Sequence, residues 1–243
     1  TTRNKVPLKQ KGAFGAGHFV LNLLPGVLGV YIQVFILTAF GMDPVWAGLL
    51  GGLPRIFDAL TDPVMGFISD NTKSTWGRRR PYIFSGAIIS GILFILMWQL
   101  DENASQTFNF WYVLILQILF LVGNTMFATP LVGLGYELTS DYNERTRLMS
   151  FANSIGQIAW IIVPWLYVII PDANTFDNPA QGVRTMAIIV GVVCMLFGVL
   201  PAIFCRGIDS VQMENRKKIT LKTLAYNLVE LWEGIKQVSK NKP

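Results

Sequence analysis

The sequence contains a single histidine and two cysteines among its 243 residues. One histidine leaves little from which to build a Ser-His-Asp triad or a metal site, and no phosphate-binding loop occurs in a suitable context. Cys194 and Cys205 stand eleven residues apart on one predicted helix, too far to form a disulfide with each other. We therefore expect neither an enzyme nor a bound cofactor.

Charged residues are also scarce. They make up 14% of the sequence against 52% hydrophobic residues, and the mean hydropathy is +0.44. This composition is too apolar for a soluble domain of such length. Because about 20 apolar residues cross a bilayer, we predict an all-α integral membrane protein with six transmembrane helices, at 13–40, 45–69, 81–100, 109–138, 149–170 and 183–205.

The basic residues predict the topology. Eighteen of the twenty lysines and arginines lie in the N-terminal arm (1–12), in the loops after the second and fourth spans, or after the sixth span. Arg184 alone lies on the opposite side. Because basic residues mark cytoplasmic loops, both termini are expected in the cytoplasm, with the chain in the cytoplasmic membrane. The bilayer is thus the expected partner, and the basic clusters require no nucleic acid.

Three charged residues interrupt the second predicted span, namely Arg55, Asp58 and Asp62. Each costs about 2.5 to 3.5 kcal/mol to insert into hydrocarbon, so such residues usually face a polar cavity and serve a function. Their spacing of three and four places them on one helical face. Two close carboxylates suit a bound Na⁺ or a shared proton, and Thr61 adds a hydroxyl. The alternative is an Arg-Asp pair that ties helices together in any membrane bundle.

The texture of the sequence changes after Arg206. In 207–243, apolar residues recur at alternating spacings of three and four from Leu221 to Val238, with charged residues between them. This pattern predicts an amphipathic cytoplasmic helix on the membrane surface or beneath the bundle. The chain has no methionine at Thr1, and its apolar stripe meets no later helix. We expect it to be a natural half or a fragment of a longer protein.

A longer motif surrounds the charged trio. It runs Arg55-Ile-Phe-Asp58-Ala-Leu-Thr-Asp62-Pro63-Val-Met-Gly66, then Ser69-Asp70, then Trp76-Gly77-Arg78-Arg79-Arg80-Pro81. With Thr125-Met126, Pro130 and Glu144-Arg145, it resembles the glycoside-pentoside-hexuronide:cation symporter family, the melibiose-carrier branch of the major facilitator superfamily. That family has twelve helices in two halves. The resemblance implies that 13–206 is the N-terminal six-helix bundle, whose partner is the missing C-terminal half.

The resemblance also implies a coupling-cation site. The matching positions are Asp58, Thr61, Asp62 and Thr125, all with oxygen ligands of the kind that hard cations prefer. Na⁺, Li⁺ and H⁺ all stay open as the coupling ion. No metal beyond such a transient cation is expected.

The family's sugar site differs in this sequence. Where the melibiose carrier has two aspartates and an arginine, this chain has His18, Ala128 and Asn153, which makes galactoside transport doubtful. The solute could be another glycoside, a uronide or something less polar. Polar residues within the spans are candidate substrate contacts, or else interhelical hydrogen-bond partners: His18, Asn22, Arg55, Asn124, Asn153 and Gln157. His18 could also relay a proton or be a packing residue.

The loop after the second span resembles the superfamily's cytoplasmic gating motif. Its members are Asp70, Arg78, Arg79 and Arg80, and Glu137 could join the same network. The arginines also obey the positive-inside rule, and both interpretations can hold together. Our main hypothesis is a secondary symporter that couples a cation to a sugar-like solute. A carrier or exporter of an amphiphilic solute is the alternative, and an enzyme or structural module is less favoured.

Overall fold

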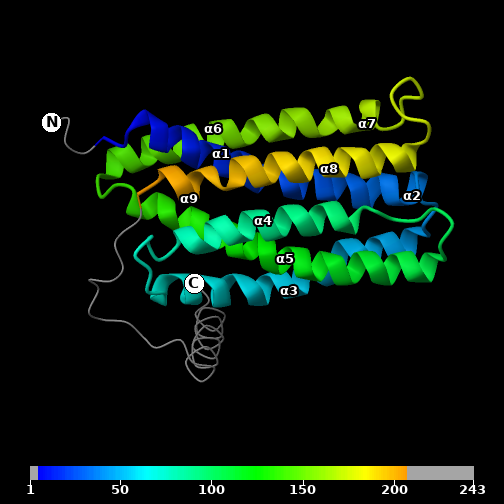
Figure 1. The fold of residues 1–243 in the computed structure, drawn as a ribbon, viewed down its shortest axis with the longest axis horizontal. Coiled ribbons are helices and arrows are strands. Elements are labelled where there is room, and N and C mark those ends of the chain that lie inside the picture. The colour runs from blue at the N-terminus through cyan, green and yellow to red at the C-terminus, as the bar shows by residue number, and fades with distance from the viewer. Residues whose placement is uncertain (1–4, 207–243) are drawn as a thin grey trace, which may run out of the picture.

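The computed structural model describes residues 5–206. Within that range helical segments form six rods (Figure 1), and each predicted span overlaps one of them. The rods, in chain order, are α1 (Leu8–Val30) continued by the π-helix η1 (Tyr31–Phe35) and α2 (Ile36–Thr38); α3 (Pro44–Asn71); α4 (Arg80–Met97); α5 (Gln106–Glu137); α6 (Tyr142–Ile162) continued by η2 (Val163–Trp165) and α7 (Leu166–Ile169); and α8 (Pro179–Gly198) followed by α9 (Leu200–Phe204).

Five of these rods are long and apolar enough to cross a membrane. They are Leu8–Thr38, Arg80–Met97, Gln106–Glu137, Tyr142–Ile169 and Pro179–Phe204. The rod formed by α3 has 28 residues but does not meet the same measure, because it carries Arg55, Asp58, Asp62 and Asp70. The structure thus supports an all-α membrane protein, whereas the count of six spans stays a prediction. The amphipathic helix predicted in 207–243 lies outside the described residues.

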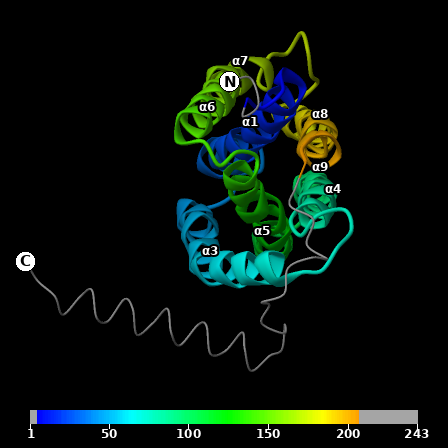
Figure 2. The ribbon, with the colours of Figure 1, turned by 90° about the vertical axis from the view of Figure 1, so that its left-hand side faces the viewer.

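The rods pack in three layers. Figure 2 shows α4 and α8 on one side of the bundle, α3 and α6 on the other, and α1 and α5 between them. The most extensive packing joins α4 to α5 and α1 to α6. Gly86 lets α4 pack closely against α5, since a Cβ there would lie 2.5 Å from the backbone nitrogen of Phe127.

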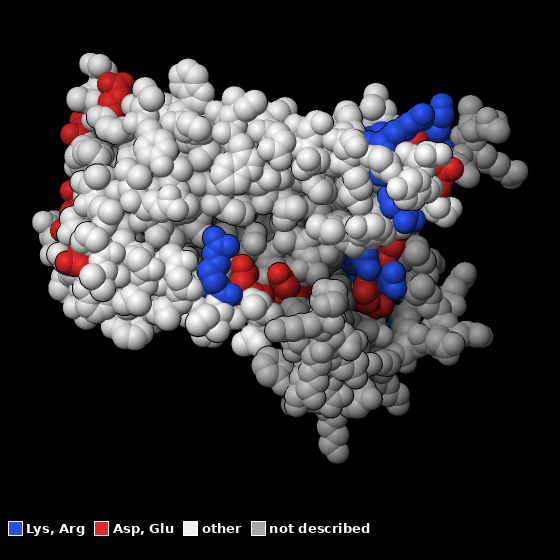
Figure 3. Space-filling view, turned by 180° about the vertical axis from the view of Figure 1, so that it is seen from behind, with Lys and Arg blue, Asp and Glu red and all other residues white. Residues whose placement is uncertain are grey.

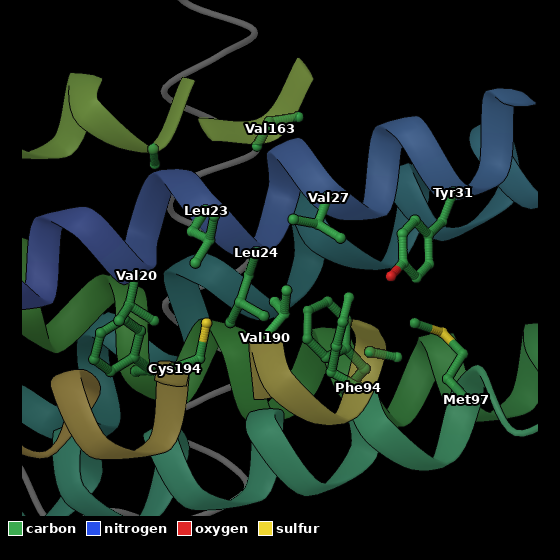
Figure 4. Close-up of a cluster of buried hydrophobic side chains, with 14 of the residues drawn as sticks. Val20, Leu23, Leu24, Val27, Tyr31, Phe94, Met97, Val163, Val190 and Cys194 are labelled. Carbon is green, nitrogen blue, oxygen red and sulfur yellow. The ribbon is translucent and has the colours of Figure 1, made fainter. Parts of the chain in front are cut away.

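The hydrophobic core runs through the bundle, and one part of it lies between α1, α4 and α8. Figure 4 shows Val20, Leu24 and Val27 of α1, and Tyr31 of η1, directed toward side chains of α4 and α8. The Tyr31 hydroxyl donates to the Val183 carbonyl at 3.3 Å. Both cysteines are free and buried in this packing. By contrast, α3 buries only five of its 28 residues, which leaves it at the open edge of the bundle.

Candidate functional site

Three of the four charged residues of α3 lie midway along the helix. The helix begins where the Asp43 side chain accepts a hydrogen bond from the Val45 amide at 2.8 Å, with Pro44 in the first turn. Figure 3 shows basic and acidic side chains next to each other partway along this face, between the charged side chains at its two ends. We call Arg55, Asp58 and Asp62 the mid-helix charges; they occupy one helical face of α3.

The mid-helix charges do not form close ion pairs. Among the described residues, none of the nitrogen–oxygen pairs within 4.0 Å involves Arg55, Asp58 or Asp62. The Arg55 and Asp62 side chains are exposed on the bundle surface, and Asp58 is half-buried. The alternative of a tight structural Arg-Asp pair is therefore not the arrangement that the structure has.

Hydroxyl groups join α3 to α5 beside these charges. The Thr61 and Thr125 Oγ1 atoms lie 3.3 Å apart, and Thr61 is also 3.3 Å from the carbonyl oxygen of Asp58. Thr125 is only 2% exposed. One turn further along α5, the Thr129 hydroxyl donates to Asp62 Oδ1 at 3.4 Å. Thr129 was missed in the sequence, although its position four residues after Thr125 puts both hydroxyls on one face of the helix.

The predicted cation ligands are thus near one another without surrounding a single point. The threonine pair lines an apolar groove with Met65, Tyr82 and Met126, whereas the Asp58 side chain lines a separate cavity. Thr61 reaches the main chain of Asp58 and not its carboxylate.

The cavity beside Asp58 has a volume of about 210 Å³ and lies between α1 with η1, α3 and α5. Its polar lining residues are Gln33, Arg55, Asp58, Gln117 and Asn124. Gln117 is 3% exposed, and neither its Oε1 atom nor the Asn124 Oδ1 atom has a hydrogen-bond partner. Gln33 and Gln117 were also missed. For Gln117 the available signal was an amide inside an apolar run, seven residues before Asn124.

The other predicted substrate residues lie elsewhere, on α1 and α6. Asn22 donates to the His18 carbonyl at 2.8 Å and accepts from the Trp160 indole nitrogen at 3.1 Å. Asn153 and Gln157 are exposed on α6. Of the six candidates, the structure therefore brings only Arg55 and Asn124 to a common cavity.

His18 is partly buried beside Phe14, and its Nε2 atom lacks a partner. The ring centroids of His18 and Phe14 lie 4.7 Å apart in an edge-on arrangement. This contact matches the packing interpretation of His18, and the unpartnered nitrogen leaves the binding interpretation open.

A second group of charges lies where the 72–79 loop meets the end of α5. Arg78 Nε is 2.6 Å from Glu137 Oε1, and Arg79 contacts both Asp70 and Glu137. We call Asp70, Arg78, Arg79 and Glu137 the loop network. Gly133 leaves room for it, because a Cβ there would overlap the Arg79 guanidinium group.

Arg80 does not belong to the loop network. Its guanidinium group donates to the carbonyls of Ala202 and Ile203 at the end of α9, where a basic group also complements the helix dipole. The structure therefore brings four of the five predicted gating residues together and separates the fifth.

A bundle of apolar rods with a cavity and charges without close ion pairs midway along one helix is typical of a membrane transport protein. Comparison with known families agrees: residues 13–243 match the family described as MFS/sugar transport protein, and the chain belongs to it. The resemblance to cation symporters of the major facilitator superfamily is confirmed, and the family is one of transporters and not of enzymes.

Several curated relatives are named as symporters or transporters. The chain is 33% identical to an uncharacterized symporter of Synechocystis sp. over 77% of this chain and 35% of the relative. It is 25% identical to the isoprimeverose transporter of Lactiplantibacillus pentosus, over 96% of this chain and 49% of the relative. It is 23% identical to the sodium-dependent lysophosphatidylcholine symporter 1 of Xenopus tropicalis, over 99% of this chain and 50% of the relative. The chain thus spans about half or less of these relatives' lengths.

Proposed function

We propose that the chain is the cation-binding half of a secondary transporter that couples Na⁺, H⁺ or Li⁺ to uptake of a sugar-like solute. The observation that carries this proposal is the set of mid-helix charges, which lack close ion pairs and lie beside a cavity and a threonine pair. Unpaired charge at mid-depth is costly in a membrane, and a visiting cation offsets that cost.

Asp58 and Asp62 are the proposed cation ligands, with Thr61 and Thr125 as further oxygen ligands. The threonine pair already bridges α3 and α5, so convergence of the carboxylates on this pair would give a small all-oxygen site. Oxygen-only sites suit Na⁺ and Li⁺, and the same carboxylates could share a proton. The relative named as sodium-dependent supports Na⁺ as the first ion to test.

A sugar-like solute is supported by the family description and by the relative named for isoprimeverose. Arg55 and Asn124 are the proposed solute contacts that share the cavity, and His18, Asn22, Asn153 and Gln157 stay candidates on the opposite pair of rods. An amphiphilic solute is not favoured by the set of relatives as a whole.

The bundle is proposed to be the N-terminal half of a twelve-helix transporter. In this proposal α3 crosses the membrane as well as the five apolar rods, which gives six membrane-spanning helices. The open face of α3 and α6 would then meet the C-terminal half, and the chain's termini would be cytoplasmic. In this arrangement the loop network lies at the cytoplasmic end and would hold one conformation of the gate.

The test is a cation titration of the intact gene product in detergent. A ligand at 100 times its Kd stabilises the folded state by about 2.7 kcal/mol, so Na⁺ or Li⁺ is expected to raise the unfolding temperature, with K⁺ at equal ionic strength as reference. Asp58→Asn and Asp62→Asn are expected to lose this response. The control Asp101→Asn, in the loop 98–105, is expected to keep it.

Solute binding completes the test. By linkage, a solute that binds better with the cation must raise cation affinity by the same factor. If solute binding is indifferent to Na⁺, Li⁺ and pH, the proposed coupling is wrong.

A further inference from the structure

A basic cavity lies at the end of the bundle where α1 and α4 begin and α9 ends. Figure 1 shows these three elements together at that end, and α9 packs against both α1 and α4. The cavity has a volume of about 390 Å³, and its charged lining residues are Lys9, Arg80 and Arg206. No carboxylate lines it among the residues that the structure describes. It shares no lining residue with the cavity beside Asp58, so the proposed transport site does not account for it.

Aromatic and carbonyl contacts hold two of the basic groups in place. The Lys9 Nζ atom lies 4.3 Å from the centroid of the Phe204 ring, a cation–π distance. The Arg80 guanidinium group donates through Nε to the Ala202 carbonyl and through Nη2 to that of Ile203. A guanidinium group has five N–H donors, so Arg80 keeps donors for a further acceptor. Both basic groups are therefore held against the end of α9.

The three basic groups lack a close ion pair in the part of the chain that the structure describes. None of Lys9, Arg80 and Arg206 lies within 4.0 Å of a carboxylate oxygen there. By contrast, Lys11 is paired with Glu144 at 2.6 Å. Like charges gathered in one cavity create a positive potential that attracts an anion. Because arginine matches the oxygens of a phosphate group and lysine binds phosphate as a point charge, a phosphate group is the ligand that fits this cavity.

The position of the cavity along the apolar rods favours a lipid over a free phosphate ion. Three of the five rods that could cross a membrane begin or end beside it, at Leu8, Arg80 and Phe204. In a bilayer, hydrocarbon would therefore give way to head groups near this level. Leu8, Ile203 and Phe204 are also exposed, so acyl chains would find an apolar surface next to the basic groups.

We infer that Lys9, Arg80 and Arg206 bind the phosphate group of an anionic phospholipid, such as phosphatidylglycerol, at the junction of α1, α4 and α9. Basic pockets between transmembrane helices bind anionic head groups in other membrane proteins. Three cations without close counter-ions favour a head group with net negative charge over a zwitterionic one, whose own cation they would repel. The inference goes beyond the proposed transport function, because this lipid is bound at the end of the bundle and is not the transported solute.

Lys73 provides a matched control. It is an exposed lysine of the 72–79 loop, which lies at the same end of the bundle (Figure 1), and it does not line the cavity. Basic residues at one membrane face attract anionic lipids even where they form no defined site. Lys73→Gln removes one such charge and leaves the proposed site intact.

The experiment titrates the intact gene product in dodecyl maltoside with dioleoylphosphatidylglycerol, dioleoylphosphatidylcholine or inorganic phosphate and follows thermal unfolding. The variants are Lys9→Gln, Arg206→Gln and Lys73→Gln. All three side chains are exposed, so each variant should unfold at the parent temperature without added lipid. Arg80 is left in place because it holds the end of α9. Lys9→Gln and Arg206→Gln should each weaken phosphatidylglycerol binding about fivefold, and Lys73→Gln by no more than about twofold.

The other ligands separate a lipid site from its alternatives. Phosphatidylglycerol should bind about tenfold or more tightly than phosphatidylcholine, and inorganic phosphate should not displace it. Its affinity should be equal in Na⁺ and K⁺, because only a coupled solute responds to the coupling cation. The inference is overturned if Lys9→Gln and Arg206→Gln act no differently from Lys73→Gln, or if phosphatidylcholine binds equally well. Displacement by inorganic phosphate, or tighter lipid binding in Na⁺, would overturn it as well.

Discussion

The two groups of charges at the interface of α3 with α5 are built differently. In the loop network each of the four charges lies within 3.3 Å of an opposite charge, and the Glu137 side chain is only 4% exposed. The mid-helix charges, about two turns away along α3 at their nearest, make no such pair among the described residues.

This difference indicates that the loop network stabilises the fold, whereas the mid-helix charges are available to bind an ion. A satisfied ion pair contributes to the fold and gains little from an added ion, whereas carboxylates without a close ion pair gain from any cation that reaches them. Four predictions test the contrast.

Glu137→Gln is expected to have the largest effect on stability. It leaves Arg78 and Arg79 without their buried partner, and breaking such a pair costs about 3 to 5 kcal/mol. Chemical denaturation of the purified protein measures the loss. The control is Glu102→Gln, which removes a half-exposed pair with Arg184 at 3.3 Å and should cost at most about 1 kcal/mol. Equal losses for the two variants would contradict the structural role of the loop network.

Gly133→Ala is expected to weaken the loop network without removing a charge. The added Cβ would displace the Arg79 guanidinium group from Asp70 and Glu137, at a cost of about 1 to 3 kcal/mol. Gly52→Ala is the matched control, since nothing lies within 4 Å of its added Cβ. Both variants gain the same helix propensity from replacing glycine by alanine. The comparison is the difference in unfolding free energy between the two variants.

Asp58→Asn is expected to act in the opposite direction. Removing an unpaired, half-buried carboxylate should leave stability without Na⁺ unchanged or raise it by about 1 kcal/mol, while stabilisation by Na⁺ is lost. Thermal unfolding with and without Na⁺ measures both quantities. A destabilisation as large as that of Glu137→Gln would make Asp58 a structural residue.

Thr129→Val is expected to have the smallest effect. It removes the hydrogen bond to Asp62 while keeping the shape of the side chain, so the cation affinity should fall about three- to tenfold through loss of about 1 kcal/mol. Thr129→Ser should restore most of the affinity, which a packing role would not predict. Cation titrations followed by thermal stability distinguish the two variants.

Much of the fold could be predicted from the sequence. Long apolar runs must become helices in a bilayer, because hydrocarbon leaves backbone groups no other partner. The helical period likewise places Arg55, Asp58 and Asp62 on one face, since residues three and four apart lie on the same side of a helix. The rod boundaries moved by a few residues, as at Leu8 in place of position 13, because Pro7 and not a change in apolarity marks the start of α1.

Contacts between helices were harder to predict. The roles of Thr129 and Gln117 follow from the packing of α5 against α3. They could not be predicted, because the sequence pattern of one helix does not show which of its faces contacts a neighbouring helix. Arg80 was grouped with Arg78 and Arg79 because it follows them in the sequence. At the start of α4, however, successive side chains diverge around the helix, and Arg80 reaches α9 instead of Glu137.

The sequence by itself determined that this is a helical membrane protein with charge inside one of its helices, since both follow from local composition and helical period. Tertiary structure alone decided which charges are paired, which amides are left without partners and which of them share a cavity. The physical reason is that pairing depends on distances between side chains far apart in the chain, and those distances are set only when the helices pack.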